Sequence, residues 1–288
     1  MLSLIARIGA RLLQGVALAY CSLTPDVRRS YNQKPVPSEG ENLFRSNGPQ
    51  AVERYSFDGI DVFYPAKAKA GGYPLVAMVN GTGIKACSYR PIFEHLASWG
   101  FVVAGNDDTY SWSGEKTAAM IERVLEMAND GGILSGKIDT DKIGVAGHSQ
   151  GSIGAINTLS LCERIKCLVI ASVPNKWLAD KLRWPYSVSD IRVPTFLAAG
   201  TRPFERFISP LSSVKSLSQS FPLNTPLACG ILSRVEHRFV LHESDAYLTA
   251  WFRLWFYDDA RARKIFVGDE AEILHNPRWQ NCSTKIPQ

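Results

Sequence analysis

The sequence predicts an α/β fold in which helices cover both faces of a mostly parallel central sheet. Three observations support this prediction. Short apolar runs, typical of strands buried on both faces, alternate with amphipathic segments typical of helices. A strand-like run, a turn flanked by glycines and a helix-like run follow one another over residues 142–161. The chain has 288 residues and 45% hydrophobic content, which is enough to bury one large sheet.

The first predicted elements form an antiparallel pair. Residues 52–57 and 61–64 alternate between apolar and polar side chains around Asp58-Gly59, a dipeptide typical of two-residue hairpin turns. Gly100 is expected to end the helix that precedes it. In this half of the chain, further strands are expected over 75–79, 101–104 and 142–146, and helices over 91–99, 114–129 and 152–161.

The second half of the chain continues the alternation. Strands are expected over 167–171, 195–199 and 227–232, and an amphipathic helix over 246–257. Trp251 and Trp255 are interpreted as core residues of that helix. These elements predict one α/β domain over residues 50–270. It would be preceded by a targeting or membrane-surface segment plus linker over 1–49 and followed by a C-terminal tail over 271–288.

The N-terminal segment admits two interpretations. Residues 1–19 carry Arg7 and Arg11 but no acidic residue, and Ala17-Leu18-Ala19 has the small-x-small form of a signal-peptidase site. The alternative is an amphipathic helix that contacts a membrane surface. Neither offers the roughly 20 uninterrupted apolar residues of a spanning helix. The sequence favours export, periplasmic or secreted, over a cytoplasmic or membrane-surface location.

Composition excludes several classes of function. The net charge of +5 is spread along the chain, which argues against a nucleic-acid partner. The six cysteines lack the paired spacing of a zinc site, and neither a P-loop nor a dinucleotide fingerprint is present. We therefore expect no cofactor and no metal. Cys229 and Cys282 could form a disulfide in an oxidising compartment. The sequence leaves the oligomeric state open.

Ser149 is the predicted nucleophile. It is the central residue of Gly147-His148-Ser149-Gln150-Gly151, which joins the strand over 142–146 to the helix that follows. Such a turn lifts the serine Oγ clear of the sheet, and the glycines leave room where Cβ atoms would collide. The helix N-terminus also favours the negative charge that develops during acyl transfer. His148 is expected to point away from Oγ.

A serine hydroxyl needs a base within hydrogen-bonding reach. His237, His242 and His275 follow the serine in the chain, and His237 is favoured because it comes shortly after the strand over 227–232. His95 lies in a predicted helix and is interpreted as an ordinary, partly exposed residue.

The third member of the site is a carboxylate between serine and histidine. Glu205 is favoured because it directly follows the strand over 195–199, and Asp180 is the alternative. Glu236 adjoins the base and is expected to point elsewhere.

Acyl transfer also needs two donors for the oxyanion. One is the backbone N–H of Gln150, the residue after the nucleophile. The other is the backbone N–H of Thr82, in the glycine-containing loop after the strand over 75–79.

Together these segments resemble the branch of the α/β-hydrolase superfamily that holds cutinase-like polyester hydrolases, chlorophyllase-like esterases and dienelactone-hydrolase relatives. The resemblance covers roughly residues 52–267. The segments that carry it are Tyr64-Pro65, 79–83, 96–103, 142–151 and Val193-Pro194-Thr195, followed by His237. It implies the α/β-hydrolase fold and a cofactor-free serine hydrolase that cleaves carboxylic esters through an acyl-enzyme.

The resemblance also implies an aromatic side chain beside the serine cleft. Trp177 falls at that place, after the strand over 167–171, and Trp112 would line the opposite wall. The branch usually has an aspartate shortly after the position of Gly200, whereas this chain has Glu205 after three intervening residues.

The segment between residues 171 and 195 is too short for a large cap domain. We therefore expect an uncovered groove for small-molecule, lipid-like or polymeric esters. Two alternatives remain: a non-catalytic binding protein with this fold, and a thioesterase or peptidase.

Overall fold

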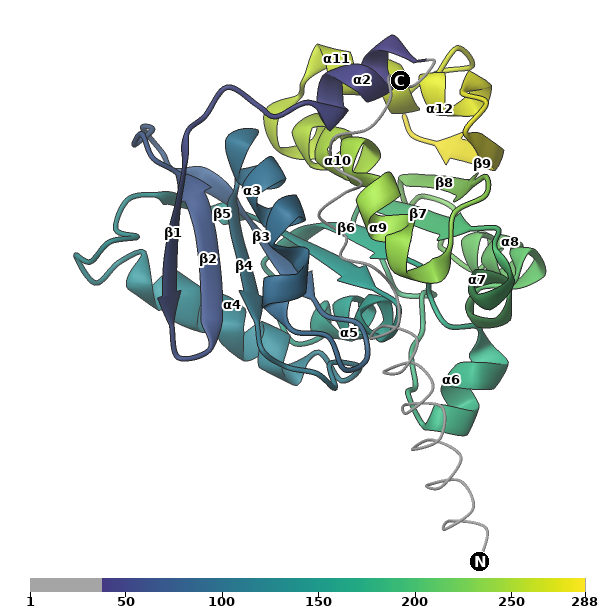
Figure 1. The fold of residues 1–288 in the computed structure, drawn as a ribbon, viewed down its shortest axis with the longest axis horizontal. Coiled ribbons are helices and arrows are strands. Elements are labelled where there is room, and N and C mark those ends of the chain that lie inside the picture. The colour runs from purple at the N-terminus through teal and green to yellow at the C-terminus, as the bar shows by residue number, and fades with distance from the viewer. Residues whose placement is uncertain (1–37, 288) are drawn as a thin grey trace, which may run out of the picture.

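The computed structural model describes residues 38–287 and contains a nine-stranded sheet in the order β1-β2-β4-β3-β5-β6-β7-β8-β9 (Figure 1). The expected targeting or membrane-surface segment, residues 1–19, lies outside these residues. The strands are β1 Val52–Phe57, β2 Ile60–Pro65, β3 Tyr73–Val79, β4 Val102–Asn106, β5 Ile138–His148, β6 Ile165–Ala171, β7 Thr195–Gly200, β8 Leu227–Leu232 and β9 Trp279–Lys285.

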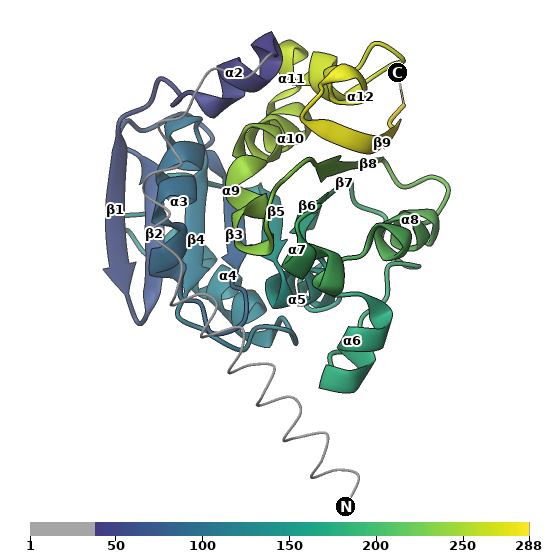
Figure 2. The ribbon, with the colours of Figure 1, turned by 45° about the vertical axis from the view of Figure 1, so that its right-hand side comes forward.

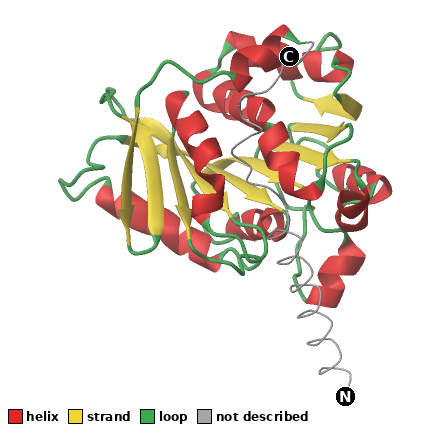
Figure 3. Cartoon of the chain, in the orientation of Figure 1, coloured by secondary structure: helices red, strands yellow, loops and turns green. Residues whose placement is uncertain are grey.

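Helices precede and connect these strands (Figure 3). The α-helices are α2 Glu39–Arg45, α3 Arg90–Ser98, α4 Glu115–Met127, α5 Gln150–Thr158, α6 Lys176–Leu182, α7 Pro203–Ile208, α8 Leu211–Gln219, α9 Val240–Glu243, α10 Asp245–Tyr257, α11 Ala260–Phe266 and α12 Glu272–His275. In the described part of the chain, the 3₁₀ turns are η2 Ala86–Tyr89 and η3 His237–Phe239. Over residues 38–287, no helix is both long and apolar enough to span a bilayer.

The predicted hairpin and parallel core are confirmed. β1 and β2 pair antiparallel, with Phe57 opposite Ile60, and both turn residues adopt positive φ angles, 47° at Asp58 and 74° at Gly59. β4, β3, β5, β6, β7 and β8 are parallel neighbours. All seven residues of β3 are buried, as expected for a strand covered on both faces.

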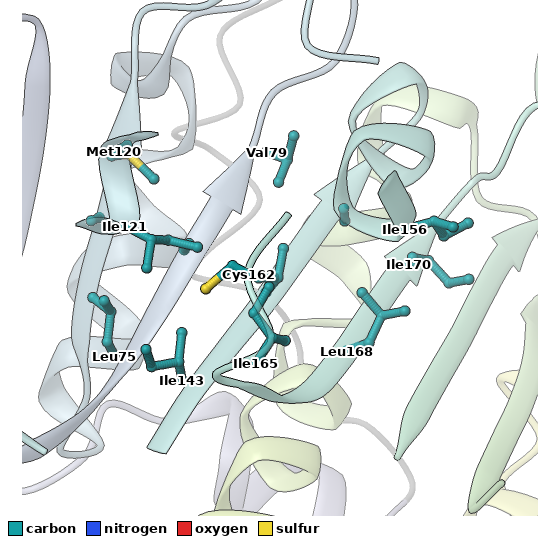
Figure 4. Close-up of a cluster of buried hydrophobic side chains, with 14 of the residues drawn as sticks. Leu75, Val79, Met120, Ile121, Ile143, Ile156, Cys162, Ile165, Leu168 and Ile170 are labelled. Atoms are coloured by element: carbon teal, nitrogen blue, oxygen red, sulfur yellow. The ribbon is translucent and has the colours of Figure 1, made fainter. Parts of the chain in front are cut away.

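Two hydrophobic layers flank the sheet. One lies between the sheet and helices α4 and α5, where α4 packs on β4 and β3 and α5 packs on β5 and β6; Met120, Ile121 and Ile156 belong to it (Figure 4). The other lies under α2, α3, α10 and α11 and includes Trp251, whose side chain is fully buried. Helices on both faces confirm the predicted α/β architecture.

The expected C-terminal tail over 271–288 is wrong for its described part. β9 pairs antiparallel with β8, with Leu232 opposite Trp279. The Trp279 ring packs 4.6 Å from that of Tyr247. This strand was not predicted because its residues are mostly polar and show no apolar pattern. As an edge strand it is held largely by backbone hydrogen bonds to β8. At the other end of the chain, the expected linker contains α2, which lies beside α10 and α11 (Figure 1).

Two expectations about single residues also need correction. Cys229 and Cys282 are free, as are the other described cysteines. Cys229 packs in the layer with α4 and α5, whereas Cys282 packs against the opposite layer, so the sheet separates the two thiols. His95 is 1% exposed rather than partly exposed, and burial lowers its pKa to about 4.

Candidate active site

The nucleophile elbow connects β5 to α5 at the carboxyl edge of the parallel strands. Ser149 has a φ angle of 58°, a conformation that L-residues rarely adopt. A Cβ atom at Gly147 would lie 2.1 Å from the carbonyl oxygen of Gly151, and one at Gly151 would lie 2.1 Å from that of Val79. Only glycine fits these two positions, where the backbone of the turn packs closely against that of α5 and β3.

The base and the acid come from the loops after β8 and β7. His237 begins η3, and its Nε2 lies 2.8 Å from the Ser149 Oγ. The Glu205 carboxylate is fully buried and accepts the Nδ1–H of His237 at 2.5 Å. Its other oxygen accepts the N–H of Gly200 at 3.0 Å. Figure 2 shows α7, which carries Glu205, at the edge of the sheet where α5 begins.

The alternative candidates lie elsewhere. Asp180 is exposed on α6, and His275 is an exposed residue of α12. His242 is buried in α9, where its ring stacks 6.2 Å from that of Tyr89. The structure therefore brings Ser149, His237 and Glu205 together and none of the three alternatives.

Neighbouring side chains form hydrogen bonds with both the backbone N–H and the backbone carbonyl oxygen of His237. Glu236 accepts its N–H at 2.9 Å, and the Nε2–H of His148 donates to its carbonyl oxygen at 2.9 Å. His148 thus points away from the Ser149 hydroxyl, as expected. Its Nδ1 lies 3.3 Å from the hydroxyl of Tyr89, and burial lowers its pKa to about 3. A neutral imidazole with its proton on Nε2 satisfies both contacts.

The loop after β3 supplies the second predicted oxyanion donor. Residues Gly81 to Ile84 form a turn closed by a 3.1 Å hydrogen bond, with Gly83 at a φ angle of 73°. The N–H of Thr82 has no protein acceptor among residues 38–287. Because the Tyr89 hydroxyl accepts the N–H of Gly81 at 3.1 Å, this loop is linked through His148 to the loop that carries the base.

Gln150 is anchored through its side chain as well. Its Oε1 accepts the N–H of Ser111 at 2.8 Å, and the Ser111 hydroxyl donates to the carbonyl oxygen of Asn80 at 2.6 Å. These contacts tie the start of α5 to the loops after β3 and β4. Hydrogen bonds through Ser111 therefore connect Gln150 to the loop that carries Thr82.

Aromatic side chains lie in the segments that follow β4, β6 and β7. Trp177 is 60% exposed at the start of α6, whereas Trp112 is partly buried and packs against the core. Phe204 lies edge-on to His237, with the two ring centroids 5.5 Å apart. Sequence reasoning missed Phe204, for which the only signal was its position next to Glu205. Within residues 38–287, no cluster of His, Cys, Asp and Glu could hold a metal ion.

Comparison with known protein families decides the classification. Residues 26–283 match the model of the family described as PETase, PET hydrolase-like. The chain belongs to this family. It is therefore an α/β-hydrolase and a serine ester hydrolase of the cutinase-like branch. The alternative of a non-catalytic binding protein loses its support, because the irregular acid loop brings Glu205 to His237.

Curated relatives are similar at modest identity. A bis(hydroxyethyl) terephthalate hydrolase of Streptomyces coelicolor is 25% identical over 245 residues, which cover 80% of this chain and 75% of the relative. Cutinase est1 of Thermobifida alba is 27% identical over 247 residues, covering 80% and 78%. Cutinase 2 of Thermobifida cellulosilytica is 32% identical over 180 residues, covering 58% and 64%.

Proposed function

We propose that Ser149, His237 and Glu205 are the catalytic triad of this ester hydrolase. The observation that carries the proposal is the continuous chain of hydrogen bonds, 2.8 Å from Ser149 Oγ to His237 Nε2 and 2.5 Å from His237 Nδ1 to Glu205. In this geometry the imidazole can accept the serine proton while the carboxylate holds its orientation and stabilises the imidazolium that forms.

The reaction then proceeds in two halves. The Ser149 Oγ attacks the ester carbonyl carbon as its proton moves to His237 Nε2, and the backbone N–H groups of Thr82 and Gln150 donate to the oxyanion. The carbon–oxygen bond to the alcohol breaks, and the alcohol takes the proton from His237. Water, deprotonated by His237, attacks the acyl-enzyme, and the returning proton restores the Ser149 hydroxyl as the acid leaves.

Replacement of the nucleophile tests this assignment. We expect Ser149→Ala to lower kcat for p-nitrophenyl butyrate by about 10⁵-fold, because the oxyanion donors alone sustain only residual catalysis. Ser160→Ala, in an exposed serine just after α5, is the matched control and should keep wild-type kcat. Circular dichroism would check that both variants fold. Turnover of Ser149→Ala at the wild-type rate would refute the proposal.

We further propose that the substrates are bulky, lipid-like or polymeric esters, including terephthalate diesters. The support is threefold: the short segment between β6 and β7, the exposed Trp177 side chain at the carboxyl edge, and the substrate named for the Streptomyces coelicolor relative. Trp177 is proposed as a contact with the substrate, and Trp112 as part of the opposite wall.

A substrate series tests this class. We expect hydrolysis of p-nitrophenyl esters to persist as the acyl chain lengthens, and hydrolysis of both bis(hydroxyethyl) terephthalate and a polyester film. Trp177→Ala should lower release from the film about fivefold, because it removes one large exposed aromatic contact. Leu161→Ala removes an exposed apolar side chain beyond the far end of α5 and should not lower it. Strict preference for acetyl esters would contradict the proposal.

We also propose export, on the basis of the sequence of residues 1–19. N-terminal sequencing of protein recovered outside the cytoplasm should begin after Ala19. An intact N-terminus on protein that sediments with membranes would instead support the amphipathic helix and membrane-surface contact.

A further inference from the structure

The proposed acid and base belong to different loops, so the spacing between these loops sets the geometry of the site. The two loops follow β7 and β8, which are parallel neighbours paired as far as Gly200 and Leu232. Beyond those residues the regular sheet contacts stop. The relative position of Glu205 and His237 therefore depends on contacts between the loops themselves.

The first of these contacts join the loops close to the sheet. The carbonyl oxygen of Val235 accepts the N–H groups of Thr201 and Arg202, both at 3.1 Å. The hydroxyl of Thr201 accepts the N–H of Arg234 at 2.7 Å. Gly200 permits this approach, because a Cβ atom there would lie 2.4 Å from the Val235 carbonyl oxygen.

Glu236 makes the contact nearest to the triad. A single oxygen, Oε1, accepts the N–H of Glu205 at 3.0 Å and the N–H of His237 at 2.9 Å. Glu205 lies in the first turn of α7 and His237 opens η3, positions where backbone N–H groups have no partner within their own helix. One carboxylate thus caps both short helices that carry the acid and the base.

We propose that Glu236 is a positioning residue that holds Glu205 and His237 at their working separation. This proposal rests on the proposed triad. Hydrogen bonds from N–H groups to a carboxylate are about twice as strong as those to a neutral acceptor. Without the side chain, two N–H groups lose their acceptor and the two loops lose their contact nearest to the imidazole. Catalysis is sensitive to such a change, since a shift of about 1 Å in a reacting group can lower the rate about 100-fold.

Three variants separate positioning from general stability. Glu236→Ala removes the acceptor, and Glu236→Gln keeps an oxygen at the same reach without the charge. Asp259→Ala is the structural control: Asp259 also accepts a helix N–H, from Arg261 at 3.0 Å, and pairs with Arg253 at 2.9 Å. It caps α11, which packs with α2 and α10 and carries no residue of the proposed site.

We expect Glu236→Ala to lower kcat about 10- to 100-fold with KM within about twofold, since the loss falls on the positioning of the base. Glu236→Gln should recover kcat to within about fivefold of wild type. Asp259→Ala should lower the melting temperature while kcat stays within about twofold of wild type. Wild-type kcat in Glu236→Ala, or equal losses in the Ala and Gln variants, would overturn the proposal.

A spectroscopic measurement makes the test independent of catalysis. The Nδ1 proton between His237 and Glu205 should give a downfield proton resonance in wild type and in Glu236→Gln, and this resonance should broaden or move in Glu236→Ala. If the triad assignment is wrong, Ser149→Ala keeps its activity while the resonance still responds to Glu236→Ala. If only the positioning role is wrong, Ser149→Ala is inactive and the resonance in Glu236→Ala matches wild type.

Discussion

Glu205→Gln is the substitution that tests the role of the acid most sharply, because it changes charge and proton donors but hardly changes shape. In the wild type both carboxylate oxygens accept: one takes the Nδ1–H of His237 at 2.5 Å and the other the N–H of Gly200 at 3.0 Å. An amide has only one acceptor oxygen, and the side chain is fully buried, so water cannot replace the lost acceptor.

The fixed backbone decides which way the amide turns. If its NH₂ group faced the N–H of Gly200, two donors would oppose each other at a cost of about 1–3 kcal/mol. If the NH₂ group faces His237 instead, Nδ1 must become the acceptor and the imidazole proton moves to Nε2. Nε2 then cannot accept the proton of Ser149. A triad with this wrong tautomer loses roughly 10⁴-fold in kcat.

The assay is hydrolysis of p-nitrophenyl butyrate at neutral pH, with circular dichroism to verify folding. We expect Glu205→Gln to lose about 10³- to 10⁴-fold in kcat, whereas Asp180→Asn, in the exposed alternative acid, should stay within about twofold of wild type. A loss of less than tenfold in Glu205→Gln, or a comparable loss in Asp180→Asn, would refute the reasoning.

Three other predictions concern the buried histidines, the nucleophile elbow and the loop that carries Thr82. Burial lowers the pKa values of His95, His148 and His242 to about 4, 3 and 4, so these side chains stay neutral in the fold while the unfolded chain takes up protons below about pH 6.5. Stability should therefore fall with pH from about 6.5 towards 4, by about 1 kcal/mol for each histidine at pH 5.5. Equal unfolding free energies in urea at pH 7.5 and 5.5 would contradict this. Gly151→Ala places a Cβ atom 2.1 Å from a carbonyl oxygen and should abolish soluble expression or activity; a folded, fully active variant would show that the elbow can relax. Tyr89→Phe removes the acceptor for the loop that carries Thr82, and we expect kcat to fall about five- to tenfold, the equivalent of about one hydrogen bond. Unchanged kinetics would mean that this contact does not position the loop.

The parallel core could be predicted because its strands carry a physical signal. Residues 75–79 form an uninterrupted apolar run, which is what a strand covered on both faces requires. The elbow could be predicted for a similar reason, since Gly147 and Gly151 occupy positions where any Cβ atom would collide with backbone. Asp58-Gly59 indicated its hairpin because both residues accept positive φ angles.

The remainder depends on contacts between segments far apart in the chain. β9 is polar and gains its place by pairing with β8, so its sequence shows no apolar pattern. Glu236 was expected to point elsewhere, and its role arises only where the loops after β7 and β8 converge. Similarly, the capping of the His237 carbonyl by His148 joins residues that are 89 positions apart. No local pattern encodes such contacts.

Labelling with a fluorophosphonate, followed by peptide mass spectrometry, tests most directly whether His237 makes the hydroxyl of Ser149 reactive. The account predicts a single adduct on the peptide that contains Ser149 in the wild type. Labelling should be at least about 10³-fold slower in His237→Ala and unchanged in His275→Ala. An adduct on another residue, or a wild-type labelling rate in His237→Ala, would contradict the account.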